Sequence, residues 1–125
     1  MDIPEDLQYT EEHEWVLVED DVIIVGITDY AQSELGDVVF VELPQVGEVV
    51  QQMEPFGTIE AVKTVADIFA PISGEVVEVN TLLEDSPHLI NEDPYGEGWI
   101  IKIKISDRSE LENLLSSEDY GNLVR

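Results

Sequence analysis

The stretch GTIEAVKTVADIFAPISGEV at residues 57–76 contains the most informative pattern in the chain. Two apolar runs rich in β-branched residues, 56–62 and 65–69, are separated only by Lys63 and Thr64. Runs of this kind are typical of strands, and a connection this short is typical of a tight hairpin. The pattern therefore predicts a β-hairpin that exposes Lys63 at its tip.

Similar short runs on both sides of this hairpin predict a mainly β chain. The 99–105 run alternates, with Trp99 and three isoleucines on one face and two lysines on the other. Clusters of turn residues separate the runs. Many short strands at close spacing indicate a β-sandwich or small barrel. The further strands are expected at 22–27, 38–43, 75–79 and 99–105.

Short helices are expected in the N-terminal half and near the C-terminus. Asp29 is expected to cap a helix that ends before Gly36, with Gln32 at the capping-box position. Asp107 precedes Glu110 by three residues, and leucines at 111, 114 and 115 follow at helical spacing. A further short helix is expected around 117–123. Such helices would cover an edge or an end of a sheet.

Length and charge restrict the class of protein. With 125 residues and a mass of 14.0 kDa, the chain predicts one domain. Five Lys or Arg against 29 Asp or Glu give a formal charge of −24, which excludes nucleic acid as a direct partner and disfavours anionic membranes. This charge also favours a monomer. Two explanations of the acidity stay open, namely docking to basic partners and adaptation to a salty or hot habitat.

Several kinds of chemistry have no support in the sequence. The chain has no cysteine, which excludes disulfides, thiolate metal sites and cysteine nucleophiles. His13 and His88 have no second histidine at metal-ligand spacing, so each is interpreted as a surface or loop imidazole rather than a zinc ligand or a catalytic base. No metal site is expected. The chain also has no apolar run of about 18 residues and no signal-like start, which predicts a cytoplasmic protein.

Lys63 is chemically distinctive because the chain contains only three lysines and the other two share the 99–105 run. An amine at a rigid hairpin tip can be acylated, and a long acyl arm attached there would swing freely. The alternative is an ordinary solubilising lysine in a turn. The residues alone leave both possibilities open.

The 57–76 stretch resembles the modified hairpin of lipoyl-bearing carrier domains. Gly47 lies 16 positions before Lys63 and Gly74 lies 11 after it, which is the spacing of that family. Both glycines follow turn residues, where a positive φ or a close backbone approach is expected. Biotinyl domains share this framework but carry methionine on both sides of the lysine, whereas Val62 and Thr64 stand here. The resemblance therefore favours a lipoyl over a biotinyl carrier.

Four further segments resemble the glycine cleavage system H protein family, and the likeness extends from about residue 9 to the C-terminal leucine-rich region. The resemblance implies a barrel-sandwich hybrid, the lipoyl-domain-like fold of two small sheets packed face to face. It implies one lipoyl-carrier domain over 1–125, with the hairpin framework at about 38–80 and a helical cap at about 107–124. The four segments are 9–16, 26–32, 35–44 and 91–99.

The resemblance also implies a function. The chain would be a carrier subunit and not an enzyme, with lipoic acid in amide linkage on Lys63. The arm would carry an aminomethyl group and reducing equivalents between three enzymes: the pyridoxal phosphate-dependent glycine decarboxylase, the tetrahydrofolate-dependent aminomethyltransferase and dihydrolipoyl dehydrogenase. Lipoate-attaching enzymes would be further partners. A biotinyl carrier and an unmodified acidic interaction module are the alternatives.

Matching positions suggest which acidic residues support the arm. Glu14 and Asp67 would lie near a cleft that shields the loaded arm, where carboxylates would attract a cationic aminomethyl group. Glu34 matches a helix position near that cleft. Glu60, three residues before the lysine, would be recognised by the attaching enzyme. Each of these could instead be an ordinary solvated acidic residue.

Overall fold

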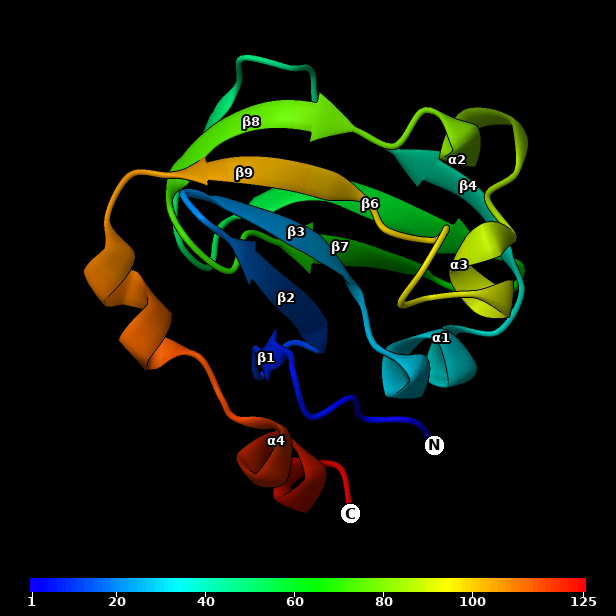
Figure 1. The fold of residues 1–125 in the computed structure, drawn as a ribbon. Coiled ribbons are helices and arrows are strands. Elements are labelled where there is room, and N and C mark those ends of the chain that lie inside the picture. The colour runs from blue at the N-terminus through cyan, green and yellow to red at the C-terminus, as the bar shows by residue number, and fades with distance from the viewer.

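The computed structural model describes all of residues 1–125 and contains two antiparallel β-sheets with a few short helices (Figure 1). One sheet has six strands in the order β1-β2-β3-β9-β8-β5, and the other has three in the order β4-β6-β7. The prediction of a mainly β, two-sheet fold is confirmed. The strands are β1 (Gln8–Tyr9), β2 (Glu14–Glu19), β3 (Val22–Ile27), β4 (Val38–Glu42), β5 (Val49–Val50), β6 (Pro55–Ala61), β7 (Val65–Phe69), β8 (Gly74–Val79) and β9 (Ile101–Ile105).

All six strands expected from the sequence are present, with ends that differ by no more than two residues. Strands β1, β2 and β5 were not expected. Both β1 and β5 have only two residues, too few to show a pattern. Strand β2 contains the continuous apolar run 15–18, which lacks the alternation that marks a half-buried strand.

The sequence predicted that Trp99 lies on the same face as the isoleucines of the 99–105 run, and this prediction is wrong. Strand β9 begins at Ile101, two residues later than predicted. Ile100 and Ile101 both enter the main core, which breaks the alternation. Trp99 instead packs with the second apolar cluster, on the side of the lysines, where Lys102 Nζ lies 5.3 Å from its ring centroid. The tryptophan therefore shares no face with the strand's isoleucines.

The main core lies between the two sheets. Its 17 buried residues include Ile23 and Ile103 from the six-stranded sheet and Ile59 and Ile68 from the three-stranded sheet. A second cluster of four buried residues lies beneath the C-terminal helix, and consists of Leu7, Tyr9, Trp15 and Tyr120. Because burial of apolar surface is the main stabilising contribution, these two clusters hold the sheets and the C-terminal segment together.

Helix α1 (Asp29–Leu35) is present and ends before Gly36 as expected, but its cap is not Asp29. The Thr28 hydroxyl oxygen accepts a hydrogen bond from the Ala31 backbone N–H at 3.2 Å, so Thr28 is the N-cap. Threonine and aspartate are both favourable caps, and their adjacency left the sequence pattern ambiguous by one residue. Two further short helices, α2 (Leu82–Asp85) and α3 (Leu89–Glu92), lie between β8 and β9 in the chain and were not expected from the sequence.

The C-terminal segment contains a 3-10 helix, η1 (Arg108–Asn113), followed by α4 (Ser117–Leu123). Asp107 caps η1 by accepting the Ser109 N–H at 3.0 Å. The helix ends before Leu114 and Leu115, which the sequence placed inside it. Leu115 instead exchanges two backbone hydrogen bonds with Tyr9, at 2.7 and 2.9 Å, and this bridge keeps it extended.

Gly47 and Gly74 occupy positions that other residues would fill only with strain. Gly47 has a φ of +99°, in the region that L-residues disfavour. Gly74 is buried where β8 meets β9, and a methyl group there would overlap the Lys104 carbonyl oxygen and lie 2.7 Å from Ile103 Cγ2. The two glycines therefore support the hairpin framework for different physical reasons.

We expect Gly74→Ala to lower the free energy of unfolding by more than about 2 kcal/mol, because the methyl group meets backbone that cannot move aside. Gly47→Ala is the matched control, since it meets no atom within 4 Å and bears only the backbone cost of about 1 kcal/mol. Urea unfolding of both variants measures the difference. Equal losses would contradict the close approach at Gly74.

Candidate functional site

Lys63 is exposed at the tip of the β6–β7 hairpin, as the sequence predicted. The connection is one residue longer than expected and consists of residues 62–64. It is closed by a 2.7 Å hydrogen bond from the Ala61 N–H to the Thr64 carbonyl oxygen. Lys63 takes part in neither of the ion pairs in the chain, so its amine is available to solvent and to an enzyme.

The hairpin tip is fastened to the corner between α1 and β4. The Val62 N–H donates to the Asp37 carbonyl oxygen at 3.0 Å. The preceding Gly36 has a φ of +81°, and a methyl group on it would lie only 3.2 Å from Lys63 Cε. The lysine stem therefore lies alongside a backbone position that has no side chain.

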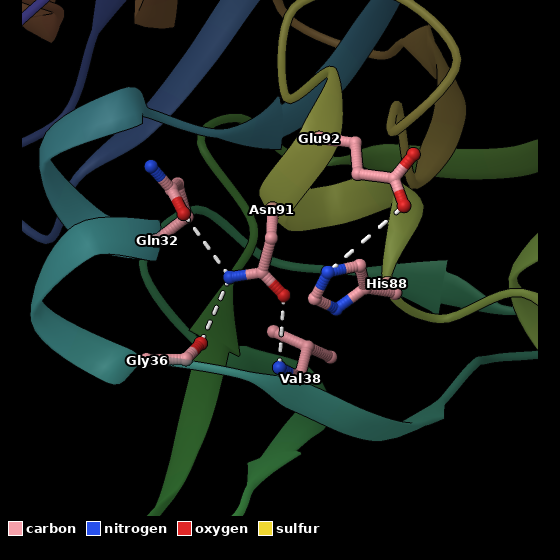
Figure 2. Close-up of polar contacts among 6 residues, drawn as sticks. All are labelled: Gln32, Gly36, Val38, His88, Asn91 and Glu92. Atoms are coloured by element: carbon pink, nitrogen blue, oxygen red, sulfur yellow. Dashed lines mark hydrogen bonds and ion pairs between the residues drawn. The ribbon is translucent and has the colours of Figure 1, made fainter.

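Asn91 also holds that corner in place (Figure 2). Its side-chain N–H groups donate to the Gly36 carbonyl oxygen at 2.8 Å and to Gln32 Oε1 at 3.0 Å. Its carbonyl oxygen accepts the Val38 N–H at 2.9 Å. One side chain on α3 thus joins the end of α1 to the start of β4, and the sequence had placed it only in a turn.

A cavity of about 440 Å³ lies between α1, β7 and the segment that leads into β2. Its walls combine apolar side chains with carboxylates. Three of the lining residues are Glu14, Glu34 and Asp67, which the family resemblance suggested as cleft residues. The remaining lining residues are Glu12, His13, Ile27, Tyr30, Ala31, Leu35, Ile59, Ala66 and Phe69.

Glu14 is the deepest of the acidic groups, with an exposed fraction of 1%. The Thr10 hydroxyl donates to one carboxyl oxygen, and the Phe69 backbone N–H donates to the other at 3.3 Å. No basic side chain pairs with it. Burial raises the pKa of Glu14 to about 8, against the lowering effect of the hydrogen bonds from Thr10 and Phe69. Its carboxyl is therefore largely uncharged at neutral pH.

His13 was interpreted from the sequence as a surface or loop imidazole, but it is half-buried at the cavity wall. Its Nδ1 is hydrogen-bonded to the Tyr120 hydroxyl at 2.9 Å, and that hydroxyl is bonded to Thr28 Oγ1 at 2.7 Å. The Tyr30 ring lies 4.9 Å away, centroid to centroid. Burial lowers the pKa of His13, opposed by the charges of Glu12 and Glu34.

Tyr30 and Tyr120 were not identified from the sequence. Tyr30 is on α1 and lines the cavity, and Tyr120 is on α4 and stacks on Tyr9 with ring centroids 4.6 Å apart. Nothing in the sequence connects a tyrosine in the last helix with His13. Only the tertiary fold brings them together.

Glu60 lies on the outer face of the three-stranded sheet and is exposed. It pairs with Phe40 on β4 and with Val65 on β7. It does not line the cavity that Glu14, Glu34 and Asp67 share. Glu60 instead flanks Lys63 on the surface that surrounds the tip.

No group of three or more His, Asp or Glu side chains is arranged to hold a metal ion. None of the helices has the length and apolar character needed to cross a membrane. The chemical features of this end of the molecule are therefore an exposed amine, an acidic cavity with apolar walls, and the outer sheet face around Glu60.

Comparison with known proteins gives a consistent result. Residues 7–125 match the family model described as "Glycine cleavage H-protein". The chain is 56% identical over 124 residues to the "Glycine cleavage system H protein" of Bacteroides thetaiotaomicron, a match that covers 99% of this chain and 98% of that one. It is 60% identical over 120 residues to the protein of the same name from Rubrobacter xylanophilus, with 96% and 93% covered.

A solved structure is also similar. The crystal structure of a glycine cleavage system H protein from Mycobacterium marinum superposes with a TM-score of 0.90 at 43% sequence identity. The superposition covers 96% of this chain and 97% of that chain. The similarity thus includes both sheets, the hairpin and the C-terminal helices.

We expect Glu14→Gln to flatten the dependence of stability on pH. The folded chain keeps the Glu14 proton up to about pH 8, whereas the unfolded chain releases it near 4.5. Between these values the folded state binds the extra proton, so stability falls as pH rises, by up to about 1.4 kcal/mol per pH unit. This contribution is fully present below pH 4.5 and is lost as pH rises through 8.

Urea unfolding of the wild type and Glu14→Gln between pH 5 and 8 measures the effect as the difference between the two curves. The free energy of unfolding of Glu14→Gln minus that of the wild type should increase as pH rises. Glu54→Gln, at an exposed carboxylate outside the cavity, is the matched control and should follow the wild type. Parallel curves for all three chains would mean that Glu14 is already ionised in the folded protein.

Proposed function

Because the chain belongs to the glycine cleavage H-protein family, the lipoyl carriers of glycine cleavage, we propose that it carries lipoic acid as an amide on Lys63. The observation that supports this most directly is the exposed Lys63 amine at the tip of a hairpin fastened to Asp37. A fixed anchor and a free amine are what attachment of a mobile arm requires. The whole chain would act as one carrier domain.

Lipoic acid supplies a dithiolane, which undergoes reversible reduction and accepts a transferred group on sulfur. This chain has no cysteine, so it offers no thiol of its own. We propose that it serves as a non-catalytic subunit visited by glycine decarboxylase, the aminomethyltransferase and dihydrolipoyl dehydrogenase. Its own residues hold, orient and shield the arm.

The cavity beside the hairpin fits a shielding role. Its apolar walls, from side chains such as Leu35, Ile59 and Phe69, suit the aliphatic part of an arm. Its carboxylates suit a cationic aminomethyl group, and we assign Glu14 and Asp67 to that contact. Glu34 lies at the cavity mouth on α1, where its exposed carboxylate attracts the same cation.

Glu14 has a second property that suits this task. A buried carboxyl without a basic partner is unfavourable in its charged form. A cation that enters the cavity supplies the missing charge and stabilises the carboxylate. Glu14 therefore holds a proton in the free cleft and gives it up when a positive group occupies the site.

We assign recognition by the lipoate-attaching enzyme to Glu60. It is exposed on the strand that leads to the tip, only three positions before Lys63.

A cytosolic location is part of the same proposal, in keeping with a cysteine-free and strongly acidic chain.

We expect the intact mass of the chain from a lipoate-competent host to increase by one lipoyl group, because Lys63 is the one lysine at a rigid tip. Lys63→Ala should abolish the increase. Lys104→Ala removes an exposed lysine on β9 and should leave the increase intact, so it is the matched control.

Other outcomes have definite meanings. A mass increase of one biotinyl group would show a biotinyl carrier, and no increase would favour an unmodified interaction module. Modification that persists in Lys63→Ala would mean that the attachment site lies elsewhere.

We expect salt to weaken partner-dependent glycine decarboxylation, because a carrier acylated on Lys63, with a formal charge of −24 − 1 = −25, is steered to basic docking surfaces. At a subsaturating carrier concentration, raising NaCl from about 0.05 to 1 M shortens the Debye length from more than about 10 Å to about 3 Å and should lower the rate. At a saturating concentration the rate should change less. A rate independent of salt in both conditions would favour habitat as the cause of the acidity.

A further inference from the structure

The surface around the Lys63 tip carries an apolar patch that neither the cleft nor the core uses. We propose that this patch is the docking surface for the enzyme that acylates Lys63, and that it binds a complementary apolar surface surrounded by arginine or lysine. This inference rests on the proposed function of Lys63. We define the hairpin-end patch as Val39, Phe40, Val62 and Val65, with exposed fractions of 48%, 55%, 75% and 61%.

Strand register makes the patch continuous across the sheet. Phe40 on β4 pairs with Glu60 on β6, which pairs with Val65 on β7. Side chains paired across antiparallel strands lie on one face, with Cβ atoms about 5 Å apart. Val39 adjoins this row at a β-bulge in β4, and Val62 adjoins it beside Lys63. The patch therefore surrounds Glu60 and extends to the tip.

The next row along the same face is acidic. Glu42 pairs with Thr58, which pairs with Asp67, and both carboxylates are exposed. Together with Glu60, the face presents three carboxylates around two apolar side chains, and no basic side chain other than Lys63 is nearby in this sheet. A surface of this composition is complementary to apolar contacts surrounded by cations.

Geometry selects the acylating enzyme among the partners. The lysine amine ends a four-carbon stem that lies alongside Gly36, so an active site that reaches it has to contact the residues around the tip. An enzyme that meets the far end of a long acyl arm has no such constraint. The hairpin-end patch is therefore in unavoidable contact only with the enzyme that forms the amide.

A second copy of this chain is a poor occupant. Two copies would bring together surfaces of the same sign, because each carries a charge of −24 and the face itself is acidic. Like charges placed opposite each other weaken association by several kcal/mol. The composition of the face thus favours a basic partner over self-association.

The test measures acylation of the unmodified full-length chain by a purified lipoate ligase. The ligase is supplied with lipoic acid and ATP and releases AMP and pyrophosphate as the amide forms on Lys63. We expect the double variant Phe40→Ser/Val65→Ser to lower kcat/KM about thirtyfold, the effect of losing a central apolar contact. Val49→Ser is the matched control, an exposed valine (71%) on β5 in the other sheet, and should retain wild-type kcat/KM.

Two further measurements separate docking from other causes. The reaction of Lys63 with a small activated acetate ester should be unchanged in the double variant, because that reagent needs no docking surface. Urea unfolding should show a free energy within about 1 kcal/mol of the wild type, as expected for surface substitutions.

The outcomes distinguish the two proposals. If the ligase acylates Lys63 equally well in the wild type and in the double variant, the proposal of a docking surface is wrong, whereas the proposed carrier function is retained. If the wild type itself gains no lipoyl group at Lys63, the carrier assignment fails and the docking inference falls with it. A dimeric wild type that the double variant converts to a monomer would assign the patch to self-association. Normal acylation with impaired glycine decarboxylation by the loaded variant would assign it to the decarboxylase.

Discussion

The arrangement of the functional end depends on the three hydrogen bonds of the Asn91 side chain. They fix the corner at which α1 ends and β4 begins, and the same corner receives the backbone N–H of Val62 from the hairpin tip. Without the Asn91 side-chain amide, the Gly36 carbonyl oxygen and the Val38 N–H would lose their hydrogen-bond partners. Each unpaired buried polar group lowers the free energy of unfolding by about 1–3 kcal/mol. One side chain on α3 therefore determines where Lys63 lies relative to α1 and the acidic cavity.

The structure separates two acidic environments that composition alone would treat as equivalent. The carboxyl of Glu14 is buried, hydrogen-bonded by Thr10 and without a cation, whereas Glu60 is exposed among apolar side chains on the outer sheet face. The first environment is chemically suited to a positive group that enters the cavity. The second is available to a protein surface. A single highly acidic chain can thus present distinct sites because burial, and not residue type, sets the properties of each carboxyl.

Sequence patterns predicted the features that depend on neighbours along the chain. The β6–β7 hairpin, the exposed tip at Lys63 and the cap at Asp107 all arise from local alternation and turn chemistry. The sequence predictions are wrong where contacts with residues far away in the chain determine the conformation. Leu115 is extended because Tyr9 pairs with it, and Trp99 changes face because Ile100 enters the core. Asn91 and Tyr120 could not be identified because their partners lie far away in the sequence.

The order of strands in the larger sheet has a consequence for synthesis on the ribosome. Strand β9 lies between β3 and β8, so that sheet stays in two pieces until residues 101–105 have emerged. The smaller sheet is complete by residue 69, but the corner that anchors its hairpin needs Asn91 from later in the chain. Chains are made from the N-terminus and their parts fold as they become available. The nascent chain therefore exposes the Lys63 hairpin before Asn91 can fix its corner, and the final geometry of the tip is reached only after residues 91 and 101–105 have emerged.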